Sequence, residues 1–213
     1  MDNFENSRTG KRHTGRDRIE ASIVTAAVRI FAECGYEGTA VAAIADAAGL
    51  SKQNLMYYFP TKQALYERVL DDVLDEWLAR METLADPTRE PAEVLRAYIK
   101  AKLRFSREQP AASRVYAMEV IGGAKLYGEQ IKRRVVPHLR RDIEVFEQWI
   151  EQGKIAKVDA THLLFSIWAM TQSYADFAAQ MTLVLGRGEL TAPDFDNAEE
   201  LITHMVTRAI AAA

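Results

Sequence analysis

Side chains that could bind the edges of nucleic-acid bases gather in one short segment, residues 51–59, which reads SKQNLMYYF. At 100° per residue of a helix, Leu55 and Phe59 share an apolar face with Met56 at its edge. The opposite face carries the polar and aromatic side chains Gln53, Asn54, Tyr57 and Tyr58. Amides can pair with adenine edges, and tyrosine hydroxyls can donate to phosphates. This face could contact DNA, although a helical hairpin whose tyrosines cover a neighbouring helix fits the spacing equally well.

The segment needs neighbours to hold it, because a helix this short is marginal in isolation. The preceding AAIADAAGL supplies small residues for a close helix crossing and a glycine, Gly49, for the turn. Thr39 is a suitable N-cap for that first helix, and Ser51 for the second. Pro60 ends the second helix by disfavouring a helical backbone at Phe59. This layout predicts a helix-turn-helix, whose second helix enters the major groove.

The rest of the chain shows helical periodicity throughout, so the sequence predicts an all-α protein. Gly35 is expected to be a left-handed cap, and Pro137 to kink or interrupt its helix. The predicted loops are DPTREP at 86–91 and GRGELTAPDFD at 186–196. The predicted helices span 16–34, 39–48, 51–59, 61–85, 92–108, 111–121, 126–152, 160–185 and 196–212.

Composition indicates a protein of the cytoplasm with no membrane segment. The 213 residues carry a net charge of −3, one cysteine and no apolar run near the roughly 20 residues that span a bilayer. Cys34 is expected to pack beside Gly35 rather than to sense oxidants. The first 15 residues form a basic arm that is either a solvated tail or a phosphate-neutralising extension.

The run GTAVAAIADAAGLSKQNLMYYFPTKQALYERVL resembles the N-terminal domain of the TetR family of transcriptional regulators. The positions that match the family pattern are Thr39, Ile44, Ala45, Ala48, Gly49, Leu50, Ser51, Leu55, Tyr58, Phe59, Thr61, Lys62 and Leu65. Gln53 replaces a frequent small residue, and Met56 stands where tyrosine is common. The resemblance implies a homodimer that binds double-stranded operator DNA and a small effector, without a cofactor. It divides the chain into the arm at 1–15, a helix-turn-helix domain at 16–62 and an effector-binding and dimerisation domain at 63–213.

The same resemblance implies which residues contact DNA. The operator-facing positions are Ser51, Lys52, Gln53, Asn54, Tyr57 and Tyr58. Thr39 and Lys62 match the family's two phosphate contacts.

Residues 161–181, THLLFSIWAMTQSYADFAAQM, form an apolar helix with unusual polar side chains. Trp168, Gln172 and Asp176 recur every four residues and therefore fall on one side. An unpaired buried amide costs about 1–3 kcal/mol, so Gln172 is expected to have a partner. The helix is either a dimer-interface helix or one wall of a pocket in which a ring stacks on indole. Trp77 would be the second wall.

Three segments are similar to those of the TetR-family regulators of pyrimidine utilisation, which respond to uracil and thymine. They are SKQNLMYYFPTKQALYERVLDDVLDEWL, SREQPAASRVYAMEVIGGA and QGKIAKVDATHLLFSIWAMTQSYADFA. The effector residues that this similarity implies are Trp77, Gln172, Trp168, Tyr174, Asp176, Arg114 and Tyr116. A sensor of drugs or fatty acyl groups, with a larger and greasier pocket, and a ligand-free helical dimer stay open as alternatives.

An enzyme is not expected. The sequence has no Gly-x-Ser-x-Gly elbow, no phosphate-binding glycine loop and no Cys-x-x-Cys pair. Its four histidines, His13, His138, His162 and His204, lack metal-ligand spacing.

Overall fold

The computed structural model describes residues 15–81 and 88–212, and all regular structure in these ranges is α-helical. The helices are α1 (Gly15–Gly38), α2 (Val41–Ala47), α3 (Lys52–Tyr58), α4 (Lys62–Met81), α5 (Pro91–Glu108), α6 (Pro110–Ile121), α7 (Gly128–Glu151), α8 (Ala160–Asp176), α9 (Ala178–Leu185) and α10 (Ala192–Ala209). The predicted all-α class is therefore confirmed. The basic arm up to residue 14 and the predicted helical residues 82–85 lie outside the described ranges.

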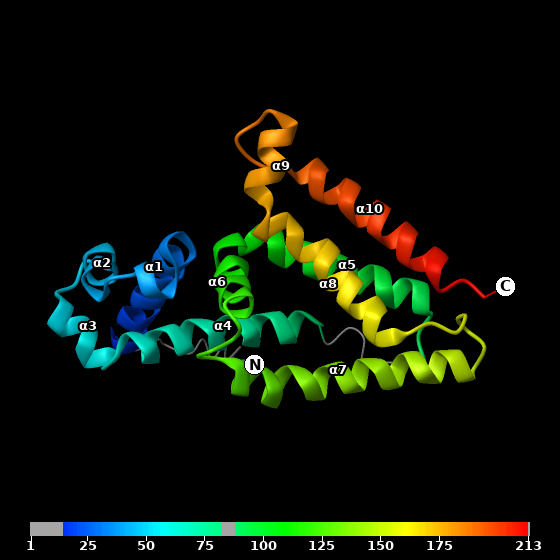
Figure 1. Ribbon diagram of the computed structural model, residues 1–213, viewed down its shortest axis with the longest axis horizontal. Helices are drawn as coiled ribbons and strands as arrows, with labels where there is room; N and C mark the ends of the chain where they lie inside the picture. Colours follow the sequence, from blue (N-terminus) through cyan, green and yellow to red (C-terminus); the bar gives the residue numbers. More distant parts are fainter. Residues whose placement is uncertain (1–14, 82–87, 213) are drawn as a thin grey trace, which may run out of the picture.

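Helices α1 to α3 form a compact group at one end of the molecule, and α4 runs from this group beneath α6 (Figure 1). Helices α5, α8 and α10 pack on one another in the larger body, while α7 contacts α8. Helix α6 packs on α1, α4 and α8, so it touches both parts of the molecule. No helix in the described ranges has the length and apolar character that crossing a membrane requires.

Local chemistry sets the turn of the helix-turn-helix as expected. Gly49 has φ +70°, a value that side chains with a Cβ rarely adopt. The Ser51 hydroxyl accepts a 3.1 Å hydrogen bond from the Asn54 amide and so caps α3. Phe59, before Pro60, is extended at φ −128° and ψ 96°, which ends the helix.

Three expectations near the end of α1 are wrong. Thr39 is not the N-cap of α2: Ala40 holds that position, and the Thr39 hydroxyl donates to the Gly35 carbonyl at 2.6 Å. Gly35 has the expected positive φ of 68°, but its ψ of 176° kinks the chain, which resumes helical turns to Gly38. Cys34, expected to pack, is exposed at this kink.

Three expectations in the larger body are also corrected. Helix α7 runs through Pro137 without interruption, and buried apolar side chains lie on both sides of the proline, from Val135 to Trp149. The predicted helix 160–185 is divided at Phe177, which leaves helical geometry at φ −111° and ψ 19°. Helix α10 begins inside the predicted loop, because Thr191 and Asp194 form a capping box there.

The core joins the two parts around the start of α4. Phe31 of α1 meets the Tyr66 ring edge-on, with ring centroids 4.9 Å apart. Tyr66 is buried and hydrogen-bonded to Glu119 of α6, and burial and this carboxylate together raise the pKa of the phenol. Glu119 also accepts hydrogen bonds from the amides of Leu126 and Tyr127 at 2.8 and 2.9 Å. The end of α6 is thus held by the small domain on one side and by the start of α7 on the other.

Candidate nucleic-acid interface and ligand pocket

The surface of α3 separates apolar and polar side chains as the periodicity predicted. Leu55 is 1% exposed and Phe59 7%, so both anchor the helix in the core. Tyr57 is 73% exposed, which is unusual for a ring on a short helix. The exposed polar side chains around it are Ser51, Lys52, Gln53 and Asn54. Two amides, a lysine and a free phenol on one face offer donors and acceptors for base edges and phosphates.

Tyr58 lies at the margin of this surface. It is half-buried, and its ring meets the Tyr57 ring at 90° with centroids 5.3 Å apart. The guanidinium of Arg16 lies 5.9 Å from the Tyr58 centroid, which brings a cation from the start of α1 to the same surface.

Thr39 and Lys62 sit differently from the α3 residues. Thr39 is buried, with its hydroxyl committed to Gly35. The Lys62 ammonium donates to the carbonyls of Tyr36 and Thr39 at 2.8 and 3.2 Å and lies 4.3 Å from the Tyr36 ring centroid. In this structure the Lys62 side chain joins the start of α4 to the end of α1, and the Thr39 hydroxyl is bonded within the end of α1 itself.

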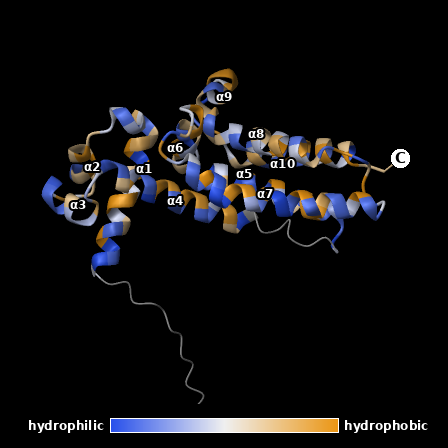
Figure 2. Cartoon of the chain, turned by 60° about the horizontal axis from the view of Figure 1, so that its bottom comes forward, coloured by the Kyte–Doolittle hydropathy of each residue, from blue (hydrophilic) through white to orange (hydrophobic). Residues whose placement is uncertain are grey.

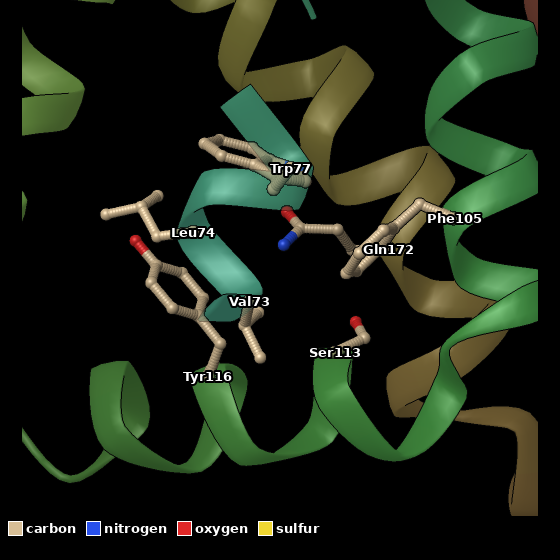
Figure 3. Close-up of a pocket in the computed structure, with 7 residues that line it drawn as sticks. All are labelled: Val73, Leu74, Trp77, Phe105, Ser113, Tyr116 and Gln172. Carbon is tan, nitrogen blue, oxygen red and sulfur yellow. The ribbon is translucent and has the colours of Figure 1, made fainter. Parts of the chain in front are cut away.

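A pocket lies where α4, α5, α6 and α8 meet (Figure 3). Trp77 and Tyr116 are stacked across it, with ring centroids 6.3 Å apart and planes inclined by 28°. The remaining lining residues are Val73, Leu74, Phe105, Ser113 and Gln172. The free volume of this pocket is about 10 Å³. A single water molecule needs about that much.

The second indole, Trp168, supports the first. Its ring meets Trp77 at 72° with centroids 5.5 Å apart, and its Nε1–H donates to the Tyr98 hydroxyl at 2.6 Å. Tyr98 is buried, and burial raises the pKa of its phenol, so it stays a neutral acceptor for this bond. Trp168 is therefore fixed in orientation beside the pocket.

Gln172 has no hydrogen-bond partner among the described residues, contrary to the expectation from its sequence position. Its amide points into the space between Trp77 and Tyr116 (Figure 3). One donor group and one acceptor oxygen are thus available on the same side chain, at the wall of a pocket.

Asp176 joins the last turn of α8 to α6. Its carboxylate accepts a 2.6 Å hydrogen bond from Ser113, which lines the pocket. Burial raises the pKa of Asp176, while the Ser113 hydrogen bond and the charges of Arg114 and Lys102 oppose that rise. Asp176 therefore lies next to the pocket, and Arg114 is near enough to act on its charge.

Tyr174 lies elsewhere. Its ring contacts Phe195 of α10, with centroids 5.8 Å apart, and it lines an open groove with Phe177 and Met181. Of the seven predicted effector residues, the structure brings Trp77, Tyr116, Trp168, Gln172 and Asp176 together, with Arg114 at the edge and Tyr174 on the other side of α8.

Lys102 is the residue that sequence reasoning missed. It is 2% exposed, and its ammonium has no hydrogen-bond partner within the described ranges. The Nζ atom lies 4.3 Å from the Trp77 ring centroid and 5.7 Å from that of Trp168. Burial lowers the pKa of this amine to about 7, against a smaller opposing effect from Asp176. In the sequence, Lys102 sits among charged residues of an amphipathic helix, and nothing distinguishes it from a solvated lysine.

The described residues include no group of three His, Cys, Asp or Glu side chains that could hold a metal ion. The chemistry of the pocket is that of ring stacking and hydrogen bonding.

Comparison with known proteins identifies relatives for both parts of the chain. Residues 23–69 match the family described as bacterial regulatory proteins, tetR family, and residues 70–213 match the family YcdC-like protein, C-terminal region. The HTH-type transcriptional regulator RutR of Escherichia coli K12 is 40% identical over 178 residues, which cover 84% of each chain.

Solved structures show the same fold. The ketosteroid transcriptional regulator KstR2 of Mycobacterium tuberculosis superposes with a TM-score of 0.74 at 22% identity, over 97% of this chain and all of that one. AibR, in complex with isovaleryl coenzyme A and operator DNA, superposes with a TM-score of 0.68 at 22% identity, over 92% of this chain and all of AibR.

Proposed function

This chain belongs to the TetR family of DNA-binding transcriptional regulators, and we propose that it controls pyrimidine utilisation by responding to uracil or thymine. The observation that carries the proposal is the unpartnered Gln172 amide between the rings of Trp77 and Tyr116. The 40% identity to RutR, together with the resemblance of its segments to regulators of pyrimidine utilisation, supports the same effector class.

We propose that α3 reads the operator. Gln53 and Asn54 are the candidates for base edges, because exposed amides can form paired hydrogen bonds with adenine. Lys52, Ser51, Tyr57 and Tyr58 would add phosphate and sugar contacts. Phosphate roles for Thr39 and Lys62 stay predictions, since both side chains hold backbone carbonyls in this structure.

A pyrimidinedione suits the chemistry of the pocket. It is flat, so it can stack on Trp77 or Tyr116, and its imide edge presents one donor beside acceptor oxygens. The Gln172 amide carries the complementary pair. A fatty acyl chain would instead leave this amide unpaired, at a cost of about 1–3 kcal/mol.

Binding must open the pocket. Its present space fits about one water molecule, whereas a cavity of about 150 Å³ takes up a benzene-sized ring. A bound ring would therefore separate Trp77 of α4 from Tyr116 of α6. Because α6 also packs on α1, this separation would change the position of the DNA-binding end. DNA is released if the effector binds the displaced state better than the DNA-bound state.

A second copy of the chain is the proposed partner for an exposed apolar surface on α8, α9 and α10. Leu183 and Val184 are 82% and 81% exposed. The other large apolar side chains exposed there are Phe165, Phe177, Leu185, Leu201 and Met205. The hydrophobic colouring at α9 and along α8 shows these stretches (Figure 2). A homodimer would cover them and pair two recognition helices for successive major grooves.

Isothermal titration of the full chain with uracil and thymine tests the effector. Heat of binding is expected for both, with weaker binding after Gln172→Leu. Tyr174→Phe is the matched control, because this residue lies on the same helix and outside the pocket. Fluorescence anisotropy with a DNA fragment selected by the protein should then show release on adding uracil. Absence of both heat and thermal stabilisation at millimolar uracil would refute the pyrimidine proposal, and binding of acyl-coenzyme A instead would favour the fatty-acyl alternative.

A further inference from the structure

Lys102 carries a buried amine whose hydrogen-bonding capacity is unused. Its Nζ atom finds no acceptor among the described residues. A buried donor without a partner costs about 1–3 kcal/mol, and more when it is charged. Within the described ranges, the hydroxyl of Thr203 is the only other buried side-chain polar group without a hydrogen-bond partner. An amine in this position therefore calls for an explanation.

Local packing prevents the amine from reaching water. Lys102 lies on α5, which packs between α8 and α10. One turn further along α5, Ser106 is buried and donates to the carbonyl of Thr171 on α8 at 2.9 Å, which fixes these two helices together. The ammonium lies 4.3 Å from the ring centroid of Trp77 and 5.7 Å from that of Trp168. These indoles attract a cation, but they do not replace an acceptor oxygen.

The same two indoles are the aromatic walls of the pocket. Trp77 lines it, and Trp168 meets Trp77 edge-on. Phe105, one turn after Lys102 on α5, lines it as well. Lys102 itself does not line the pocket, and Trp77 is the side chain that both the amine and the pocket contact. A ring that opens the pocket beside Trp77 would reach the amine at this indole.

We infer that Lys102 is a specificity-determining residue that donates a hydrogen bond to a carbonyl oxygen of the bound effector. The inference rests on the proposed function, and it adds the group that selects among pyrimidines. A lysine amine that is protonated offers three donors and no acceptor. Gln172 can turn its amide to match either the imide edge of uracil or the corresponding edge of cytosine. In its protonated form Lys102 cannot adapt in this way, so it favours the carbonyl of uracil and disfavours the exocyclic amino group of cytosine.

The unused donor also supplies a reason for the response. In the ligand-free protein the cost of burying Lys102 is not offset by a hydrogen bond. A ligand oxygen removes that cost only in the opened state of the pocket, because the closed pocket has no room for the ring. Such a difference in free energy between two states is what an effector needs in order to shift their populations.

The protonation of Lys102 gives an independent signature. With a pKa of about 7 in the free protein, most of the population is neutral at pH 8. An acceptor oxygen favours the charged form, so binding should draw a proton from solution at this pH. The surrounding charges are Asp176 on α8, which raises the pKa of Lys102, and Arg114 on α6, which acts on Asp176. Within the described ranges, α4 and α10 contribute no charge that shifts it.

Calorimetric titration of the wild-type chain and of Lys102→Met, each with uracil and with cytosine, tests the inference. The wild type should bind uracil, and Lys102→Met should raise the Kd for uracil about 10- to 100-fold, the range for one hydrogen bond to a charged group. The ratio of the two Kd values, cytosine over uracil, should shrink in the variant. Thermal unfolding checks the fold of the variant, and Tyr174→Phe serves as a control with an unchanged ratio.

A measurement on the wild type alone covers the case in which Lys102→Met does not fold. Uracil binding at pH 8, followed in two buffers with different heats of ionisation, should show net proton uptake. If the wild type binds uracil but shows no uptake, or if Lys102→Met binds uracil as tightly as the wild type, the role of Lys102 is refuted and the proposed function stands. If the wild type binds no pyrimidinedione, both are refuted.

Discussion

The ammonium of Lys62 donates a 2.8 Å hydrogen bond to the backbone carbonyl of Tyr36 and so joins the first turn of α4 to the end of α1. A second bond to the Thr39 carbonyl, at 3.2 Å, and the nearby Tyr36 ring complete the contact. The lysine after the proline in this sequence motif thus has a structural task before any DNA is present. Its contribution to stability and its contribution to DNA binding can be measured separately.

Lys62→Met should lower the free energy of unfolding by about 1–3 kcal/mol, because two backbone carbonyls lose a charged donor. Urea denaturation followed by circular dichroism measures this change. Lys52→Met is the matched control, since Lys52 is exposed on α3 and should leave stability unchanged. Equal stability of the Lys62 variant and the wild type would show that the contact is not formed in solution.

Lys52→Ala and Asn54→Ala should affect DNA binding in different ways. Lys52, at the start of α3, is expected to neutralise a phosphate, so its loss should weaken binding to all sequences and reduce the salt slope by about 1. Asn54→Ala should relax sequence preference at one position, at a cost of about 1–3 kcal/mol for the preferred base. Anisotropy titrations at several salt concentrations, on the selected operator and on single-base variants of it, distinguish the two effects. Identical salt slopes for wild type and Lys52→Ala would contradict the phosphate role.

Asp142 on α7 should make the protein less stable as the pH rises from about 4 to about 7. Burial raises the pKa of Asp142 to about 7, with a smaller opposing effect from Arg141. A carboxyl group that binds its proton more tightly in the folded state stabilises that state below the unfolded pKa, and this stabilisation is lost as the pH passes the folded pKa. Asp142→Asn should remove the decline in urea midpoints between pH 4.5 and 7.5. The exposed Asp196→Asn should keep it.

Lys102 should make the protein more stable as the pH rises, which is the opposite of the effect of Asp142. Its folded pKa of about 7 lies below the ordinary value for lysine, so the unfolded chain holds the proton more tightly. Stability should therefore rise as the pH increases from about 7 towards 9.5. Lys102→Met should be insensitive over this range and at least as stable as the wild type near pH 7, because it no longer buries an unpaired charge. A wild-type profile that stays flat between pH 7 and 9.5 would mean that the amine is not buried as described.

Features that depend on neighbours in the sequence were predictable. The two faces of α3 follow from a 100° step, and the Ser51 cap follows from residue type and position. The grouping of Trp168, Gln172 and Asp176 follows from four-residue spacing. The resemblance to a known family added Trp77 and Tyr116, which periodicity alone treats as ordinary apolar positions.

Features that depend on tertiary contacts were not predictable. Helical periodicity predicts residues 160–185 as one helix, whereas the structure divides them at Phe177, next to the residue, Asp176, that Ser113 of another helix contacts. Lys102 is buried because α5 packs against both α8 and α10, and the residues around Lys102 in the sequence do not indicate this packing. The position of Phe105 and Ser113 at one pocket depends likewise on how α5 and α6 meet.

The exposed Cys34 at the kink of α1 has a practical consequence. Because it is the one thiol among 213 residues, any maleimide or methanethiosulfonate reagent labels the same point of the DNA-binding end in every molecule. In the proposed homodimer, two nitroxide labels at this position would report the distance between the two DNA-binding ends, measured by pulsed electron paramagnetic resonance. The displacement of the DNA-binding ends that an effector is expected to cause can thus be measured without changing the wild-type sequence.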